Sequence, residues 1–121
     1  ANLSHMLAKA NRLRTADDFR VTMRTGRKVS TGTMVLYLKR DLDSVQTRFG
    51  FVVAKTVGNA VVRNLVKRRF RALSHQNLNA FPVGSSVVVR ALPQAGASDW
   101  NKLSTDFKSA LARAFSEDKQ A

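Results

Sequence analysis

The stretch "NAVVRNLVKRRFRAL", residues 59–73, constrains the fold most, because it combines a helical apolar pattern with a dense run of cations. Five cations fall within the nine positions from Arg63 to Arg71. At about 100° per residue, the polar side chains share an arc of about 140° and the apolar ones occupy the other side. The polar arc holds Arg63, Asn64, Lys67, Arg68 and Arg71, and the apolar arc holds Val62, Leu65, Val66, Phe70 and Leu73. We therefore expect a helix that packs on one face and presents cations on the other.

Arg69 does not fit this division, because it falls inside the apolar arc. Two explanations remain open at this point. Its long side chain can extend past the core to water, or the helix is less deeply buried at that position.

The cationic face lacks the acidic residues that normally accompany solvated lysines and arginines. A charged helix face is most often only solvated, but such faces usually mix signs, since Glu and Lys four residues apart stabilise each other. No acidic residue occurs between Lys55 and Arg71. Like charges at 63, 67 and 71 repel by a few tenths of a kcal/mol per pair. This pattern favours contact with a polyanion over simple solvation.

The overall charge supports the same interpretation. The 121 residues include 21 Lys and Arg against 8 Asp and Glu, a net charge of +13, and 44% of them are apolar. This composition suits one folded domain with a polyanionic partner. Nucleic acid is the first candidate. An anionic membrane is the rival, but it would require large apolar residues exposed beside the cations, and we expect the apolar arc to lie in the core.

Other sequence features bear on cellular location and on the extent of the domain. There is no cysteine, which excludes disulfides and thiolate metal sites and permits an intracellular setting. We expect a cytoplasmic location. No apolar run approaches the ~18 residues of a membrane span. Residues 1–5, including "SH" before Met6, are expected to be a cloning scar, so His5 is expected to have no functional role. Residues 6–121 are expected to form a single RNA-binding domain.

The remaining patterns predict an α+β domain with the element order α-β-β-α-β-α. Thr15 is expected to cap a short helix that stops at Gly26. Residues 29–40 and 47–55 are expected to form two strands of an antiparallel hairpin. Gly58 and Asn59 open the cationic helix. Residues 85–91 form an apolar strand expected inside a sheet, and Ser98 is expected to cap a final amphipathic helix.

The chain shows no catalytic centre of its own. The acidic residues are dispersed, mostly at expected helix starts, in the hairpin turn or near the C-terminus, and they predict caps and turns rather than a metal site. Without His5, His75 has no histidine partner for acid–base catalysis. No glycine-rich phosphate loop is present. We therefore expect a binding protein that performs no chemistry and binds no cofactor alone.

The stretch "KTVGNAVVRNLVKRRFRAL" resembles the protein component of bacterial ribonuclease P. The resemblance extends in order to "RL" at 12–13, "DDF" ending at Phe19, "VLY" ending at Tyr37, "RFGFVVAK" and the last helix, or roughly residues 12–115. The helix motif of this family is carried by Lys55, Gly58, Ala60, Val61, Arg63, Asn64, Lys67, Arg68 and Arg71.

The resemblance implies both a fold and a function. The fold is a single-domain α/β sandwich with a left-handed β-α-β crossover, although general statistics would favour a right-handed one. The function is to assist the catalytic RNA that removes the 5′ leader from precursor tRNA. The RNA performs the hydrolysis with Mg²⁺, which the RNA–protein complex requires. The partners are this RNA and precursor tRNA, with no membrane, and protein partners are not identified.

The resemblance also implies two RNA-binding regions. The catalytic RNA would contact Arg63, Asn64, Lys67, Arg68 and Arg71, and the single-stranded leader would occupy a cleft with Phe19, Met23, Tyr37 and Lys55. Two residues depart from the family pattern. Met23 replaces a second aromatic residue, and Thr56 replaces a second lysine after Lys55. The alternative function is a structural ribosomal-type RNA-binding protein without a role in tRNA processing.

Overall fold

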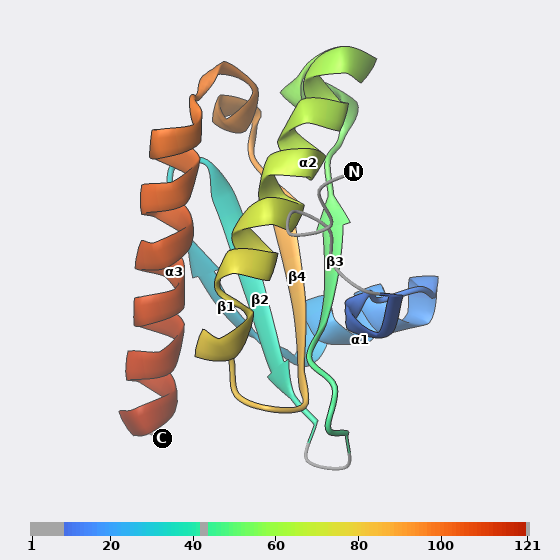
Figure 1. The fold of residues 1–121 in the computed structure, drawn as a ribbon, viewed down its shortest axis with the longest axis vertical. Helices are drawn as coiled ribbons and strands as arrows, with labels where there is room; N and C mark the ends of the chain where they lie inside the picture. The colour runs from blue at the N-terminus through green and yellow to red at the C-terminus, as the bar shows by residue number, and fades with distance from the viewer. Residues whose placement is uncertain (1–8, 42–43, 121) are drawn as a thin grey trace.

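Within the described residues, a four-stranded sheet separates two layers of helices (Figure 1). The computed structural model describes residues 9–41 and 44–120, with side chains as far as residue 115. The expected scar at residues 1–5 lies outside the described residues. The strands are β1 (Arg27–Ser30), β2 (Met34–Arg40), β3 (Arg48–Val52) and β4 (Ser85–Ala91). The α-helices are α1 (Ala16–Thr25), α2 (Ala60–Gln76) and α3 (Trp100–Gln120), joined by short 3-10 turns that include η2 (Lys9–Asn11), η3 (Lys55–Val57), η4 (Leu78–Ala80) and η5 (Pro93–Ala97).

The sheet has the strand order β1-β2-β4-β3, which corrects the predicted hairpin. The predicted strand 29–40 is divided by a turn at Thr31, whose amide donates to the carbonyl of Met34 at 2.8 Å. β1 and β2 pair as an antiparallel hairpin, and β2 pairs next with β4. β3 lies on the far side of β4 and runs parallel to it, so the predicted pairing of residues 29–40 with 47–55 is wrong.

Burial explains why β4 takes the place between β2 and β3. Val87, Val88 and Val89 are consecutive in β4 and each is 0% exposed, so apolar side chains cover both faces of this strand. Only an interior position offers neighbours on both sides and helices on both faces. The prediction that residues 85–91 lie inside the sheet is therefore confirmed.

The connection from β3 through α2 to β4 is left-handed, as the family resemblance implies. β3 and β4 are parallel neighbours, so the connection is a true crossover. In Figure 1, α2 lies in front of the sheet and the strands β3 and β4 both point upward, while the chain moves to the left from β3 to β4. A right-handed crossover would move to the right in this view. The α+β single-domain prediction is confirmed, with one strand more than expected.

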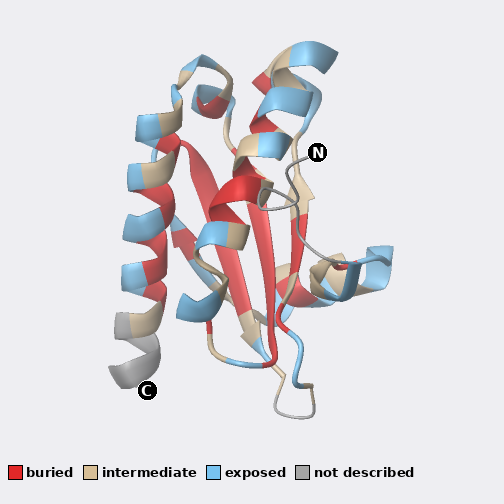
Figure 2. Cartoon of the chain, in the orientation of Figure 1, coloured by how far each residue is buried: buried red, intermediate tan, exposed pale blue. Residues whose placement is uncertain are grey.

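Two apolar clusters fill the layers on either side of the sheet (Figure 2). The larger cluster joins α2 and α3 to one face, around the fully buried Phe49, Phe70 and Phe107. The smaller cluster joins α1 to the other face, where Tyr37 and Val88 lie beneath the helix. Thus α1 and the cationic helix α2 lie on opposite faces of one sheet.

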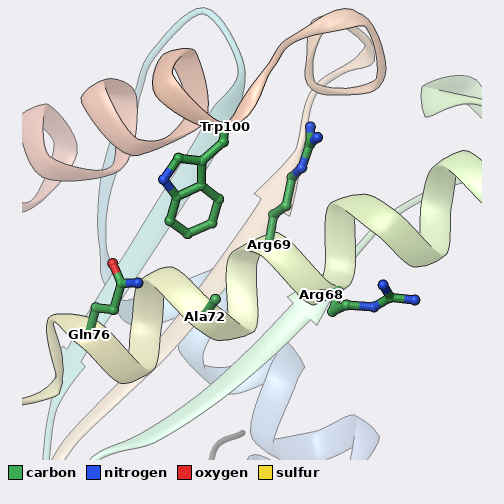
Figure 3. A pocket seen from close by; sticks show the side chains of 5 residues that line it. All are labelled: Arg68, Arg69, Ala72, Gln76 and Trp100. Carbon is green, nitrogen blue, oxygen red and sulfur yellow. The ribbon is translucent and has the colours of Figure 1, made fainter. Parts of the chain in front are cut away.

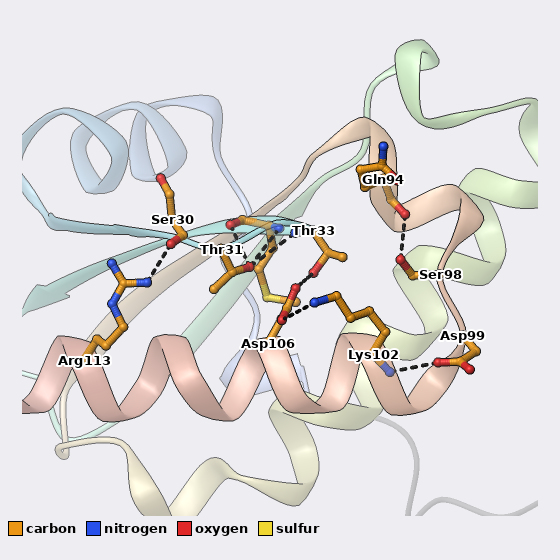
Figure 4. Close-up of polar contacts among 10 residues, drawn as sticks. Ser30, Thr31, Thr33, Gln94, Ser98, Asp99, Lys102, Asp106 and Arg113 are labelled. Atoms are coloured by element: carbon orange, nitrogen blue, oxygen red, sulfur yellow. Dashed lines mark hydrogen bonds and ion pairs between the residues drawn. The ribbon is translucent and has the colours of Figure 1, made fainter.

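The predicted cap at Thr15 is confirmed, and Asn59 caps α2 at the position where the sequence predicted the start of that helix. The Oγ1 of Thr15 accepts from the amide of Asp18 at 3.1 Å, and the Oδ1 of Asn59 accepts from the amide of Val62 at 3.0 Å. The prediction for Ser98 is wrong by one position. Asp99 caps α3 by accepting from the amide of Lys102 at 2.8 Å, whereas the Ser98 hydroxyl donates to the carbonyl of Gln94 (Figure 4).

Candidate nucleic-acid interface

The cationic face of α2 is held in place by the buried residues on its other side. Val66, Phe70 and Leu73 are at most 1% exposed and pack into the larger cluster. On the other face, Asn64 and Arg68 are exposed and Arg63 is half-buried. We call this face the rail and define it as Arg63, Asn64, Lys67, Arg68 and Arg71. The division of α2 into a core face and a cationic face is as predicted.

The rail has no negative partner in the described part of the chain. Its side chains form no hydrogen bond or ion pair with residues 9–41 or 44–115. In addition, the Nε–H of Arg63 is buried without a hydrogen-bond partner. A buried, unpaired donor on a guanidinium is costly unless a ligand accepts from it. The rail therefore presents several unneutralised cations on a rigid helix.

Leu65 departs from the predicted apolar arc. It is 39% exposed, and Val61, one helical turn earlier, is 76% exposed. Leu65 falls at the margin of the arc, so the sheet and α3 cover Val66 and Phe70 but leave Leu65 partly open. The result is a short apolar stripe beside the rail.

Arg69 links α2 to the start of α3, which explains why an arginine lies in the apolar arc of α2. Its Nη1 donates to the carbonyl oxygen of Ser98 at 3.0 Å. The side chain therefore runs along the core surface and ends on a backbone acceptor. The side chain does extend past the core, as the first explanation proposed, but its guanidinium group ends on a backbone carbonyl and not only in water.

Phe19, Met23 and Tyr37 are brought together on the opposite face of the sheet. They line an open hollow of about 660 Å³ between α1 and β2, which we call the cleft. Phe19 and Met23 are half-buried, whereas Tyr37 is 5% exposed and contributes mainly to the floor. Lys55 is exposed in η3 and does not line the cleft. The structure thus gathers three of the four predicted cleft residues.

The cleft also contains two arginines that were not among the predicted leader-binding residues. Arg20 and Arg24 line it together with Ala16. Arg20 also pairs with the exposed Asp17. A helical projection of residues 16–25 would have placed both arginines beside Phe19 and Met23.

A further cation, Arg90, lies on the same sheet face as the cleft. It follows Val88 by two residues in β4, so both side chains point to the α1 face. Its Nε is buried and has no hydrogen-bond partner among the described residues. Strand alternation in residues 85–91 was the signal that could have identified it.

The rail and the cleft meet at the outer edge of β3, along which the segment before α1 lies. A small hollow of about 140 Å³ there is lined by Phe19 from α1, by Lys67 and Arg71 from α2, and by Arg12 from the segment before α1. The amide of Leu13 donates to the carbonyl of Phe49 at 2.8 Å and so fixes this segment along β3. The two predicted RNA-binding regions are therefore adjacent, although their helices lie on opposite faces.

The described residues offer no metal site of the usual kind. No group of three or more His, Cys, Asp or Glu side chains among them could hold a metal ion. Among the acids whose side chains are described, Asp106 departs from the expectation that acids serve as caps and turns. It is buried in α3, accepts from the Thr33 hydroxyl at 2.6 Å and pairs with Lys102 at 3.2 Å (Figure 4).

These contacts set the ionisation of Asp106. Burial alone would raise the pKa of its carboxyl, but the hydrogen bonds from Thr33 and Lys102 and the charge of Lys102 outweigh it, so the pKa lies below its ordinary value of 3.8. Asp106 joins α3 to the turn after β1 and serves structure. None of the helices in the described part is long and apolar enough to cross a membrane.

The sequence matches the model of the family described as Ribonuclease P over residues 7–115. A ribonuclease P protein component of Clavibacter michiganensis is 44% identical over 109 residues, which cover 90% of this chain and 96% of the relative. One of Arthrobacter sp. (strain FB24) is 47% identical over 106 residues, covering 88% of this chain and 78% of the relative.

Solved structures show the same fold. The RNase P protein of Staphylococcus aureus is 25% identical and superposes with a TM-score of 0.80, covering 88% of this chain and 96% of that one. The RNase P protein of Thermotoga maritima is 24% identical, with a TM-score of 0.74 and coverages of 84% and 96%. The likeness in sequence and in fold thus extends over almost all of the described chain.

Proposed function

Because this chain belongs to the ribonuclease P protein family, we propose that it is the protein subunit of a ribonuclease P that removes the 5′ leader from precursor tRNA. The rail binds the catalytic RNA, and the cleft binds the leader. The enzyme is the RNA–protein complex, and hydrolysis resides in the RNA. The protein binds the catalytic RNA and positions the leader.

One observation carries the RNA-binding part of this proposal. The rail presents four cations and an asparagine on a helix whose opposite face is buried in the core. Its side chains lack any partner among the described residues. Phosphate oxygens are suitable acceptors for such a surface, because guanidinium groups bind them in bidentate geometry. Each phosphate contacted also releases counterions, which increases affinity at low salt.

The cleft suits a single strand rather than a duplex. Phe19 offers a half-buried ring and Met23 a flexible apolar side chain, so an unpaired base can stack there at about 1–3 kcal/mol. Arg20 and Arg24 lie at the same hollow and can neutralise the backbone of that strand. Lys55 is exposed beyond β3 and could contact the leader only further along its path.

The required Mg²⁺ is assigned to the RNA. The described acidic side chains form no cluster that fits a divalent ion. By neutralising phosphates, the rail would lower the concentration of Mg²⁺ that the folded RNA needs.

The decisive experiment is reconstitution with a bacterial ribonuclease P RNA. At a low Mg²⁺ concentration at which the RNA alone is inactive, addition of the protein should restore cleavage of precursor tRNA at the mature 5′ end. The matched control is the protein with the four rail cations replaced by glutamine. Equal cleavage with and without wild-type protein, across a Mg²⁺ titration, would contradict the proposal.

A further inference from the structure

A third surface, separate from the cleft and adjoining the rail, lies between α2 and the start of α3 (Figure 3). It is a hollow of about 480 Å³, within the range of small-ligand pockets. We call it the tryptophan pocket. It is lined by Arg68, Arg69, Ala72, Gln76 and Trp100.

Trp100 forms the main wall of the pocket. It is the only tryptophan of the chain and is the first residue of α3. Its half-buried indole extends toward α2, above Ala72 and between Gln76 and Arg69 (Figure 3). The small side chain of Ala72 leaves one face of this space open. Indole rings are large, rigid stacking surfaces for planar ligands.

Two arginines line the pocket: Arg69 extends toward the loop before α3, and the Arg68 guanidinium points away from the indole (Figure 3). The hydrogen bond from Arg69 to the carbonyl of Ser98 holds its guanidinium in place at 3.0 Å. Arg68 is exposed and belongs to the rail. Planar guanidinium groups stack on aromatic rings and bind phosphate, so they suit a nucleotide better than an aliphatic side chain. No acidic residue lines the pocket.

The polar groups of the pocket are available to a ligand. The side chains of Gln76, Trp100 and Arg68 form no hydrogen bond with residues in the described ranges. The amide of Gln76 can both donate and accept, and the indole N–H can donate. Such groups can pair with the edge of a base.

From these features we infer that the tryptophan pocket binds one unpaired nucleobase of the catalytic RNA, stacked on Trp100, with its phosphate near Arg68. The inference rests on the proposed function. The base comes from the RNA held by the rail and not from the leader, because Arg68 is shared with the rail and the cleft lies on the opposite face of the sheet. The partly exposed Val61 and Leu65 extend the apolar surface along α2.

Trp100 supplies its own reporter. Its fluorescence should decrease when the protein is titrated with a bacterial ribonuclease P RNA, because a stacked base quenches indole emission. Heparin binds the same cations without offering a base, so it should leave the emission nearly unchanged at saturation. Precursor tRNA alone should also have little effect. Equal quenching by heparin and RNA, or none by RNA, would overturn the inference.

Substitutions provide an independent test. Trp100→Leu keeps an apolar side chain but removes the ring, and we expect affinity for the catalytic RNA to fall about tenfold, within the range for the loss of one base stack. Trp100→Phe should restore most of the affinity. Melting curves establish that each variant is folded. Affinity within twofold of wild type for a folded Trp100→Leu would overturn the inference and would favour an apolar protein side chain as the occupant.

A charge substitution avoids the core altogether. Gln76 is exposed, and Gln76→Glu places a carboxylate in the pocket without changing its shape. The matched control is Asn79→Asp, the same amide-to-carboxylate change at an exposed site in η4. Gln76→Glu should weaken RNA binding several-fold more than Asn79→Asp, and equal effects would count against the pocket.

The two proposals fail in different ways. If the wild-type protein neither binds the catalytic RNA nor restores cleavage at low Mg²⁺, the proposed function fails and this inference fails with it. If the protein does both, but the emission of Trp100 and the Gln76→Glu variant respond like their controls, only the tryptophan pocket is refuted.

Discussion

The ring of Phe19 lies directly against the backbone of Gly50, so that a Cβ atom built on Gly50 would come within 2.4 Å of two ring carbons. The absence of a side chain at this position in β3 allows α1 to approach the edge of the sheet. As a result, Phe19 lies between the cleft and the hollow that Lys67 and Arg71 line.

Gly50→Ala should therefore displace Phe19. We expect the free energy of unfolding to fall by about 1–3 kcal/mol, the usual cost of an overpacked contact, and leader binding to weaken as well. Urea denaturation measures the first effect. Gly32→Ala is the matched control, because its Cβ would meet only a carboxylate oxygen of Asp106 at 3.9 Å. Comparable losses for both variants would show that the Phe19 contact is not the cause.

Leader binding should depend on the ring of Phe19. In the complex with the catalytic RNA, at fixed salt and Mg²⁺, Phe19→Leu should weaken binding of precursor tRNA by about 1–3 kcal/mol, the value of one base stack. Binding of mature tRNA, which lacks the leader, should barely change. Met23→Phe should have the opposite effect. Losses of the same size for both tRNAs would return Phe19 to a purely structural role.

Binding to the catalytic RNA should be strongly salt-dependent. With about four to six phosphates contacted, the slope of log K against log salt should be roughly −3 to −5. Neutralising Arg63, Lys67, Arg68 and Arg71 together should reduce the magnitude of this slope by about 0.7–0.9 for each phosphate that is no longer neutralised. Circular dichroism should show an intact fold, because these side chains lie away from the core.

A control pair of substitutions shows whether the salt dependence of RNA binding comes from the position of the rail cations or from the total charge of the protein. Arg68→Gln with Arg71→Gln removes two rail cations, whereas Lys28→Gln with Lys108→Gln removes two exposed cations from β1 and α3. Only the rail pair should reduce the slope by the full amount. The same reduction in both variants would mean that the protein binds RNA through its net charge alone.

The Asp106 contacts should make stability depend on pH. The pKa of Asp106 is lower in the folded protein than its ordinary value of 3.8. The contribution of Asp106 to the free energy of unfolding is therefore complete above pH 3.8 and is lost as the pH falls through the lower folded-state pKa. Asp106→Asn should cost about 1–3 kcal/mol at pH 7, and its difference from wild type should shrink below about pH 4.

Chemical denaturation at several pH values tests this expectation. Asp99→Asn is the control, because asparagine caps a helix about as well as aspartate. This variant should remain close to wild type at pH 7. A constant difference between Asp106→Asn and wild type down to pH 2 would show that the carboxylate charge contributes nothing.

The protein alone should cleave nothing. The described residues contain no cluster of acidic or histidine side chains that could hold a metal ion. Repurified protein free of RNA should give no product from precursor tRNA in a single-turnover assay. Activity that follows the protein peak through successive columns would disprove this expectation.

Features fixed by nearby residues could be predicted from the sequence. The cap at Thr15, the start of α2 after Asn59 and the two faces of α2 depend on residues within a few positions of one another, so local patterns predicted them. The error at Ser98 is of the same local kind, because Asp99 follows directly and its carboxylate is as good a cap.

Features that depend on distant pairing were harder to predict. The hairpin prediction failed because the place of β4 is decided by burial on both of its faces, not by the loop after residue 40. The left-handed crossover and the grouping of Phe19 with Tyr37 came from the family resemblance. The tryptophan pocket is lined by Trp100 from α3 and Gln76 from α2, and no spacing within either helix shows that the two residues line one hollow.

The central place of β4 also has a consequence for how the chain folds during synthesis. β2 and β3 are made before β4, yet each pairs in the native sheet with β4 and not with the other. The sheet can therefore close only after residue 91 has left the ribosome. A β2–β3 hairpin formed earlier would have to open again to admit β4. The net charge of +13 would oppose self-association of the nascent chain during this interval.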